Sequence, residues 1–155
     1  MKSKARLVQY LDQIEAYIPN RLAKNEKISK VDIAWQLDHC LNVIIGISKA
    51  LKKSDPKDYV FKFNSYWFVL GTLYWIPRGK GRSPKVVLPE GQLTEEKLRD
   101  KVKEARLVIQ ELDQLHPNAF FYHPYFGSRN LKSALRFMGI HTHHHMKICR
   151  DILKS

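Results

Sequence analysis

The last part of the chain concentrates histidines in a pattern that could bind a metal ion. Four of the seven histidines lie within five positions, at residue 141 and at residues 143–145. The apolar residues on either side recur at helical spacing, which predicts a helix with His141 and His145 on its apolar face. Residues four apart on a helix have Cβ atoms roughly 5–6 Å apart, so these two imidazoles can point at one centre. His143 is rotated away from that face, whereas His144, three residues after His141, remains an alternative to His145.

Two histidines on a buried stripe need a polar partner. A buried imidazole without one costs on the order of 1–3 kcal/mol, and one metal ion can serve both rings. A third histidine lies on the apolar stripe of an earlier helix, which consists of Trp35, His39, Val43, Gly46, Ile47 and Ala50. In helical bundles, side chains from facing helices build such sites in the core of the bundle, so we expect the three histidines there. Three imidazoles would leave positions on the metal open, as in catalytic rather than structural sites.

These histidines also have a simpler interpretation as ordinary core or surface residues. A single histidine such as His39 is more often a satisfied core residue than a ligand. The pair on the last helix shifts the balance, because histidine clusters are a compositional signal of metal binding. Imidazole nitrogens suit Zn, Ni, Fe or Cu, and the pattern does not choose among these metals.

A further histidine precedes the last helix, in the segment His123-Pro-Tyr-Phe-Gly127. It is either a turn residue among aromatic side chains or a group at the pocket that holds substrate or carries protons. The two cysteines, Cys40 and Cys149, are too few for a disulfide framework. We expect both thiols to be reduced and mostly buried.

Amphipathic periodicity predicts four long helices that must position these side chains. They cover residues 4–18, 31–52, 94–115 and 128–153. Pro19 ends the first helix, Ser29 or Asp32 caps the second, and Thr94 and Ser128 cap the other two. The inner side of the third long helix is expected to carry Leu98, Val102, Ala105, Leu107, Val108 and Leu112.

A long crossing connects the second and third long helices. We expect residues 59–76 to form one short buried helix, residues 77–84 a loop and residues 86–91 an extended segment. Residues 120–127 are expected to form an aromatic loop before the last helix. The predicted fold is therefore all-α, a four-helix bundle with a long crossover between helices 2 and 3. It would form one domain over residues 1–155.

Composition indicates a globular protein and narrows the choice of partners. Of the 155 residues, 44% are hydrophobic, which is typical of a folded core rather than of disorder. No run approaches the roughly 18 apolar residues of a membrane span, and no signal-peptide core follows the first residues, so we expect a cytoplasmic protein without membrane partners. The net charge of +12 permits nucleic-acid binding. The basic residues are spread along the chain rather than clustered, so nucleic acid is not the expected partner.

With these motifs placed, the chain resembles the DinB-like (YfiT-like) superfamily of metal-binding four-helix bundles. The resemblance rests on Trp35-Gln-Leu-Asp-His39 in the second helix and His141-Thr-His-His-His145 in the last, and it covers almost the whole chain. The HPYFG segment at residues 123–127 is most similar to a branch of unassigned function. The resemblance implies a homodimer and a divalent metal, zinc or nickel, held by His39, His141 and His145.

Superfamily members of known activity are thiol-dependent transferases and isomerases that use low-molecular-weight thiols such as bacillithiol or mycothiol. This branch departs from them in the HPYFG segment and in its long loop at residues 77–93. Our first hypothesis is a cytoplasmic metal-dependent enzyme acting on a small molecule, a thiol S-transferase or a hydrolase. The alternative is a non-catalytic binding protein that keeps the three histidines but acts through its basic surface, on nucleic acid.

Overall fold

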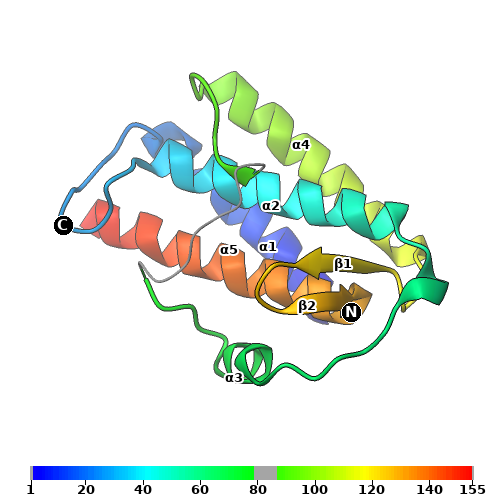
Figure 1. Cartoon of the computed structure of the whole chain (residues 1–155). Coiled ribbons are helices and arrows are strands. Elements are labelled where there is room, and N and C mark those ends of the chain that lie inside the picture. Colours follow the sequence, from blue (N-terminus) through cyan, green and yellow to red (C-terminus); the bar gives the residue numbers. More distant parts are fainter. Residues whose placement is uncertain (1, 79–86, 155) are drawn as a thin grey trace.

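The computed structural model describes residues 2–78 and 87–154, and these residues form a mostly helical fold (Figure 1), which confirms the helical class expected from the sequence. The helices and strands, in chain order, are α1 (Lys2–Tyr17), α2 (Ile33–Lys53), α3 (Ser65–Leu73), α4 (Glu95–Glu111), β1 (Phe120–His123), β2 (Gly127–Asn130) and α5 (Leu131–Lys154). Short 3-10 turns occupy Ile18–Asn20, Pro56–Asp58 and Leu112–Gln114. No helix within the described ranges has the length and apolar character needed to cross a membrane.

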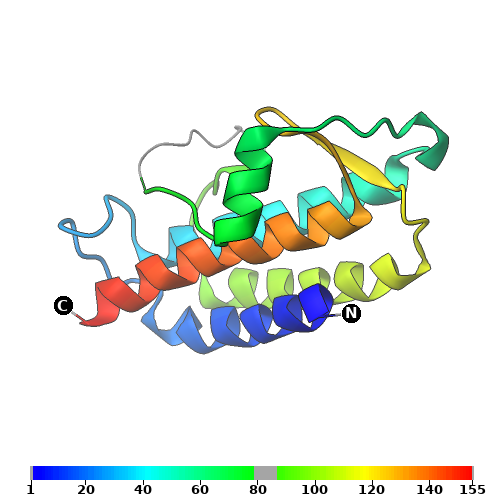
Figure 2. The same cartoon turned by 90° about the horizontal axis from the view of Figure 1, so that it is seen from below.

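The four long helices pack in two layers. α2 packs against α4 and α5, and α1 packs against the same two helices, so α1 and α2 occupy opposite corners. In Figure 2, α2 and α5 lie side by side on one level, and α1 and α4 form the level beneath them. α3 and the β1–β2 hairpin lie on the outer side of the α2–α5 layer. Both faces of that layer are therefore covered by other parts of the chain.

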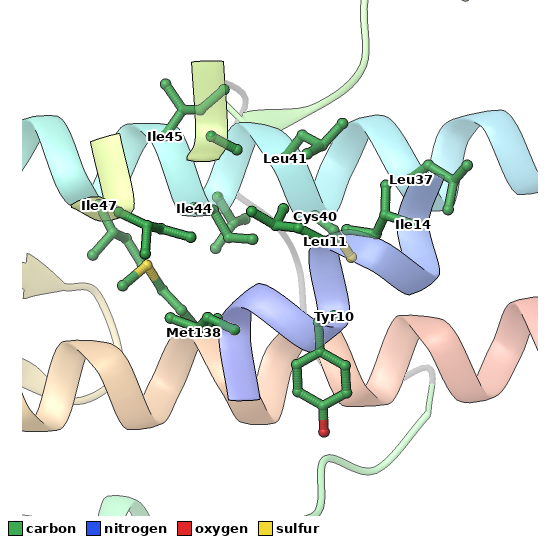
Figure 3. Close-up of a cluster of buried hydrophobic side chains, with 14 of the residues drawn as sticks. Tyr10, Leu11, Ile14, Leu37, Cys40, Leu41, Ile44, Ile45, Ile47 and Met138 are labelled. Atoms are coloured by element: carbon green, nitrogen blue, oxygen red, sulfur yellow. The ribbon is translucent and has the colours of Figure 1, made fainter. Parts of the chain in front are cut away.

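Apolar side chains fill the space between the layers. Leu11 and Ile14 of α1 lie among Cys40, Leu41 and Ile44 of α2 (Figure 3), and all five are fully buried. Burying one such aliphatic side chain stabilises the fold by about 1.5–3 kcal/mol. This packing fixes the rotation of α2 about its axis, and with it the direction in which His39 points.

The predicted helix boundaries are close to the observed ones. Asp32, rather than Ser29, caps α2, because its Oδ1 accepts a hydrogen bond from the Trp35 backbone at 2.9 Å. Thr94 caps α4 through the Lys97 backbone N–H at 3.2 Å, as predicted. The inner face assigned to this helix was wrong at one position, since Leu107 is 61% exposed.

The crossing segment differs more from the prediction. Its helix is only the nine residues of α3, and most of their side chains are exposed rather than buried; Leu70 and Gly71 are the buried ones. α3 is attached to α5 by the Arg136 guanidinium, whose Nε donates to the Gly71 carbonyl at 2.9 Å. Residues 88–91 of the segment predicted to be extended form neither a helix nor a strand. The rest of the predicted loop and extended segment, at residues 79–86, lies outside the described residues.

The predicted aromatic loop is instead an antiparallel hairpin. β1 pairs with β2 so that Phe120 is opposite Asn130 and His123 is opposite Gly127. Phe121 is buried and Tyr122 exposed, which is the two-residue alternation of a strand. Gly127 adopts a positive φ of 72° after the three-residue turn, a conformation that glycine accepts without strain.

The hairpin also changes the assignment of the cap of α5. Ser128 lies within β2, and the Asn130 side chain accepts the hydrogen bond from the Ser133 backbone at 3.1 Å. We expect Asn130→Ala to lower the free energy of unfolding by about 1 kcal/mol, the usual effect of losing such a cap. Ser128→Ala should change it by less than about 0.5 kcal/mol. Urea unfolding of both variants checks this, and a larger loss in Ser128→Ala would show that the cap is misassigned.

Candidate metal centre

Three histidines from two helices converge on one point. His39 of α2 and His141 and His145 of α5 each offer one ring nitrogen, and these nitrogens lie within 4.8 Å of one another. The Nε2 atoms of His39 and His141 are 3.2 Å apart. Two nitrogens bound at about 2.0–2.1 Å to a tetrahedral zinc ion lie roughly 3.3 Å apart. The donor atoms and the spacing of this pair thus fit a shared divalent metal.

Hydrogen bonds on the far side of two rings orient them toward this point. His39 Nδ1 donates to the Val87 carbonyl at 2.8 Å, and His145 Nδ1 donates to Gln36 Oε1 at 2.5 Å. Gln36 is itself fixed, because its Nε2 lies 3.1 Å from Ser29 Oγ. With the proton held at Nδ1, each ring keeps the Nε2 lone pair available for a ligand bond, which is the usual role of such outer partners at metal sites.

The rings of the cluster are held by packing as well. Trp35 stacks on His39 with ring centroids 4.9 Å apart, and the ring centroids of Phe137 and His141 are 5.8 Å apart. His141 Nδ1 is buried and has no hydrogen-bond partner among the described residues. Its orientation therefore depends on its neighbours and on whatever its Nε2 binds.

Burial keeps all three histidines in the form that binds metals. Desolvation lowers the pKa of His39, and it lowers the pKa of His141 and His145 well below the ordinary value near 6.5. A neutral imidazole is the ligand form, whereas a protonated one has no free lone pair. The cluster includes no carboxylate or thiolate, so a divalent ion bound here would keep its full positive charge.

The cluster forms part of the wall of a pocket of about 580 Å³. The pocket lies on the outer side of the α2–α5 layer, since its lining comes from α2, α5, α3, the hairpin and neighbouring loop residues, and no described residue of α1 or α4 lines it. The site is therefore not enclosed between all four long helices, as the expected bundle-core site would be. It faces α3 and the hairpin, which supply part of the pocket's lining.

The apolar stripe around His39 on α2 faces this pocket rather than the interior between the two helix layers. All six of its members line the pocket, namely Trp35, His39, Val43, Gly46, Ile47 and Ala50. The face of α2 that packs against α1 instead carries Cys40, Leu41 and Ile44. α2 is apolar on two sides because one faces the core and the other faces the pocket.

Two further histidines line the same pocket. His123 stacks on Phe126 with centroids 4.1 Å apart, and its Nδ1 accepts from the Tyr125 backbone at 3.2 Å. Burial, together with the charge of Arg129, lowers the pKa of His123 to about 4. Burial, together with the charge of Arg78, lowers the pKa of His144 to about 4. His123 thus occupies the pocket position considered for it, as an uncharged side chain with its proton at Nε2.

The structure also separates the remaining histidines of the cluster in α5. His145, and not His144, belongs to the group of three nitrogens; the His144 ring lies edge-on to it at 5.1 Å. His143 is on another face, where its Nδ1 lies 3.1 Å from the Tyr10 hydroxyl. Cys40 and Cys149 are both free and buried, as expected, and burial raises the pKa of each thiol.

Two groups that orient the cluster were missed by the sequence reasoning. Gln36 lies three residues before His39 on the same side of α2, so the spacing could have indicated a polar partner near the site. The Val87 contact uses a backbone carbonyl, which every residue type has, so the sequence could not indicate it. Both depend on segments that approach α2 or α5 only after folding.

Replacing Gln36 tests the orienting hydrogen bond. We expect Gln36→Leu to weaken metal binding by about 10- to 100-fold, because it removes the acceptor that holds the proton at His145 Nδ1. Gln36→Glu keeps an acceptor of the same length and should retain at least the wild-type affinity. Competition titrations with a coloured chelator give both values, and equal affinities for Gln36→Leu and wild type would contradict this role.

Comparison with known families agrees with this geometry. A family model described as the DinB superfamily matches residues 4–149, which include all three histidines of the cluster. Comparisons with curated proteins and with solved structures gave no match. The chain belongs to the DinB superfamily.

Proposed function

We propose that this protein is a metal-dependent enzyme that acts on a small molecule, as a thiol S-transferase or a hydrolase. The observation that carries the proposal is the convergence of three neutral imidazoles, two of them buried and that of His141 partly buried, on the wall of an accessible pocket. A closed structural site would have four protein ligands, whereas three leave a position for water or substrate. The described residues of the cluster supply three.

His39, His141 and His145 would hold the ion, and zinc or nickel suits their nitrogens. When bound, the metal would act as a Lewis acid and lower the pKa of a water or thiol bound to it. Val87 and Gln36 keep the lone pairs of two ligands directed at the ion. These partners also hold the protons of His39 and His145 at Nδ1, on the side of each ring opposite the metal position.

The pocket supplies what the ligands do not. Its aromatic side chains exclude water around the bound substrate, which strengthens electrostatic interactions there. His123 would bind a substrate oxygen or sulfur through its Nε2–H, because its Nδ1 is occupied by the Tyr125 backbone N–H.

Further assignments belong to the same proposal. The packing of α1, α2, α4 and α5 supports a four-helix bundle with a crossover from α2 to α4. We assign the chain to one domain that acts in the cytoplasm as a homodimer. The family resemblance supports a low-molecular-weight thiol as one substrate.

Metal content and activity together test the function. Protein purified without a tag should contain about one Zn or Ni per chain by elemental analysis, as expected for one three-histidine site. It should join a small thiol to a chloronitroaromatic electrophile, releasing chloride and the thiol proton, or hydrolyse an activated ester. This activity should be lost on chelation and regained when the metal is restored. An absence of metal after incubation with both ions would refute the centre. A bound metal without either activity would refute the enzymatic part.

A further inference from the structure

The pocket beside the three histidines is lined without a charged side chain among the described residues. Its lining comprises 22 residues, and none of them is Asp, Glu, Lys or Arg. Charged residues make up 27% of the chain, so a lining of average composition would include about six. The described lining therefore contains fewer charged residues than the chain as a whole.

Aromatic and aliphatic groups take the place of charges. Seven of the lining residues are Trp, Tyr or Phe, although these types make up 11% of the chain. Phe121, Phe126 and Phe137 are buried in the wall, whereas Tyr66, Tyr122 and Tyr125 are exposed at its outer part. The aromatic surface thus continues from the interior of the pocket to its opening.

The polar groups that remain can offer only neutral hydrogen bonds. Asn42 is already committed, because its amide nitrogen donates to Asp38 at 2.9 Å and its oxygen accepts from Lys101 at 2.7 Å. The tyrosine hydroxyls, the Trp35 indole N–H and the imidazoles complete the polar side-chain groups of the described lining. Away from the metal position, an anionic group entering this space would lose water without meeting a described lining side chain of opposite charge, and burial of an unpaired charge is strongly unfavourable.

We propose that the pocket binds a neutral, apolar molecule with an aromatic or hydrocarbon body, and that this molecule is the substrate that receives or loses the transferred group. The inference rests on the proposed function, since it is the metal centre that makes the pocket a reaction site. It adds the chemical class of the substrate. The pocket volume of about 580 Å³ lies within the 300–1,000 Å³ range of small-molecule sites.

A matched pair of fluorescent probes tests the class of ligand. N-phenyl-1-naphthylamine is neutral, and 8-anilinonaphthalene-1-sulfonate has the same ring skeleton with one added anionic group. Titrations use the metal-free protein, in which no bound ion can attract the sulfonate, at an ionic strength of about 1 M, where the Debye length is roughly 3 Å and surface charges are screened. We expect saturable binding of one neutral probe per chain, at least about tenfold tighter than the anion, because no described lining residue carries a positive charge.

A large side chain introduced at Gly46 should fill the pocket, because this residue lies on the rigid helix α2 and lines the pocket. A Cβ added there has no heavy atom within 4 Å. Gly46→Phe should weaken the neutral probe by about tenfold or more by occupying its space. Leu107→Phe adds an aromatic ring to the exposed side of α4, away from the pocket, and should leave binding unchanged. If Gly46→Phe fails to fold, as judged by circular dichroism, Ala50→Trp fills the same pocket from one helical turn further on.

The outcomes separate this inference from the proposed function. Tighter binding of the anionic probe, lost in the filled variant, overturns the neutral class even if the protein contains one metal per chain. Neutral-probe binding that is the same in Gly46→Phe and wild type also overturns it, since the probe would then lie on the exposed aromatic surface. Protein that takes up no metal after incubation with zinc and nickel, but binds the neutral probe in the pocket, overturns the metal-dependent function and leaves the pocket's ligand class in place.

Discussion

His141→Ala should remove the metal, from about one ion per chain to a level near zero in protein purified without a tag. His141 supplies one of three nitrogens, and its Nε2 lies 3.2 Å from His39 Nε2. Loss of an outer hydrogen bond alone weakens metal sites by about 10- to 100-fold, so loss of a ligand should exceed a hundredfold. Elemental analysis and a chelator competition measure both quantities.

His143→Ala is the matched control for this result. It changes the same residue type on the same helix two positions away, and His143 faces Tyr10 rather than the cluster. It should retain about one ion per chain, as expected for an intact three-histidine site. Retention of metal in His141→Ala, or equal loss in both variants, would show that the ion is bound elsewhere. Circular dichroism of the metal-free proteins excludes unfolding as the cause of a loss.

The ligand candidates could be selected from the sequence because helical spacing is a local property. His141 and His145 share a face whatever the rest of the chain does. The choice of His145 over His144 required the rotation of α5, which its packing against α1 and α2 sets. A pattern uncertain by one residue could not settle that choice.

Other features depended on contacts that no local pattern encodes. The stripe around His39 was correctly identified as apolar, but an apolar side chain facing a pocket looks the same in sequence as one facing the core. α3 was expected to be buried because of its aromatic content, and the structure shows most of that content exposed. The hairpin was missed because its strands have only four residues each, too short for alternation to be distinguished from a loop.

A buried ion pair between α2 and α4 gives the largest expected effect on stability. Lys101 Nζ lies 2.5 Å from Asp38 Oδ1, and the Asp38 side chain has no exposed surface. We expect Lys101→Met to lower the free energy of unfolding by about 3 kcal/mol, since removing one partner leaves a buried charge uncompensated. The value lies at the lower end of the usual range because Asn42 still donates to Asp38. Urea unfolding measures the change.

The same two helices offer an exposed ion pair as the control. Lys49 of α2 and Glu104 of α4 are 2.7 Å apart with both side chains about half exposed, so Lys49→Met should cost less than about 1 kcal/mol. The double variant Asp38→Asn with Lys101→Met removes the buried carboxylate and keeps an amide beside Asn42. It should recover more than half of the lost stability, because the penalty comes from the unpaired charge rather than from the missing lysine. Equal costs for Lys101→Met and Lys49→Met would instead mean that water solvates Asp38 in the folded protein.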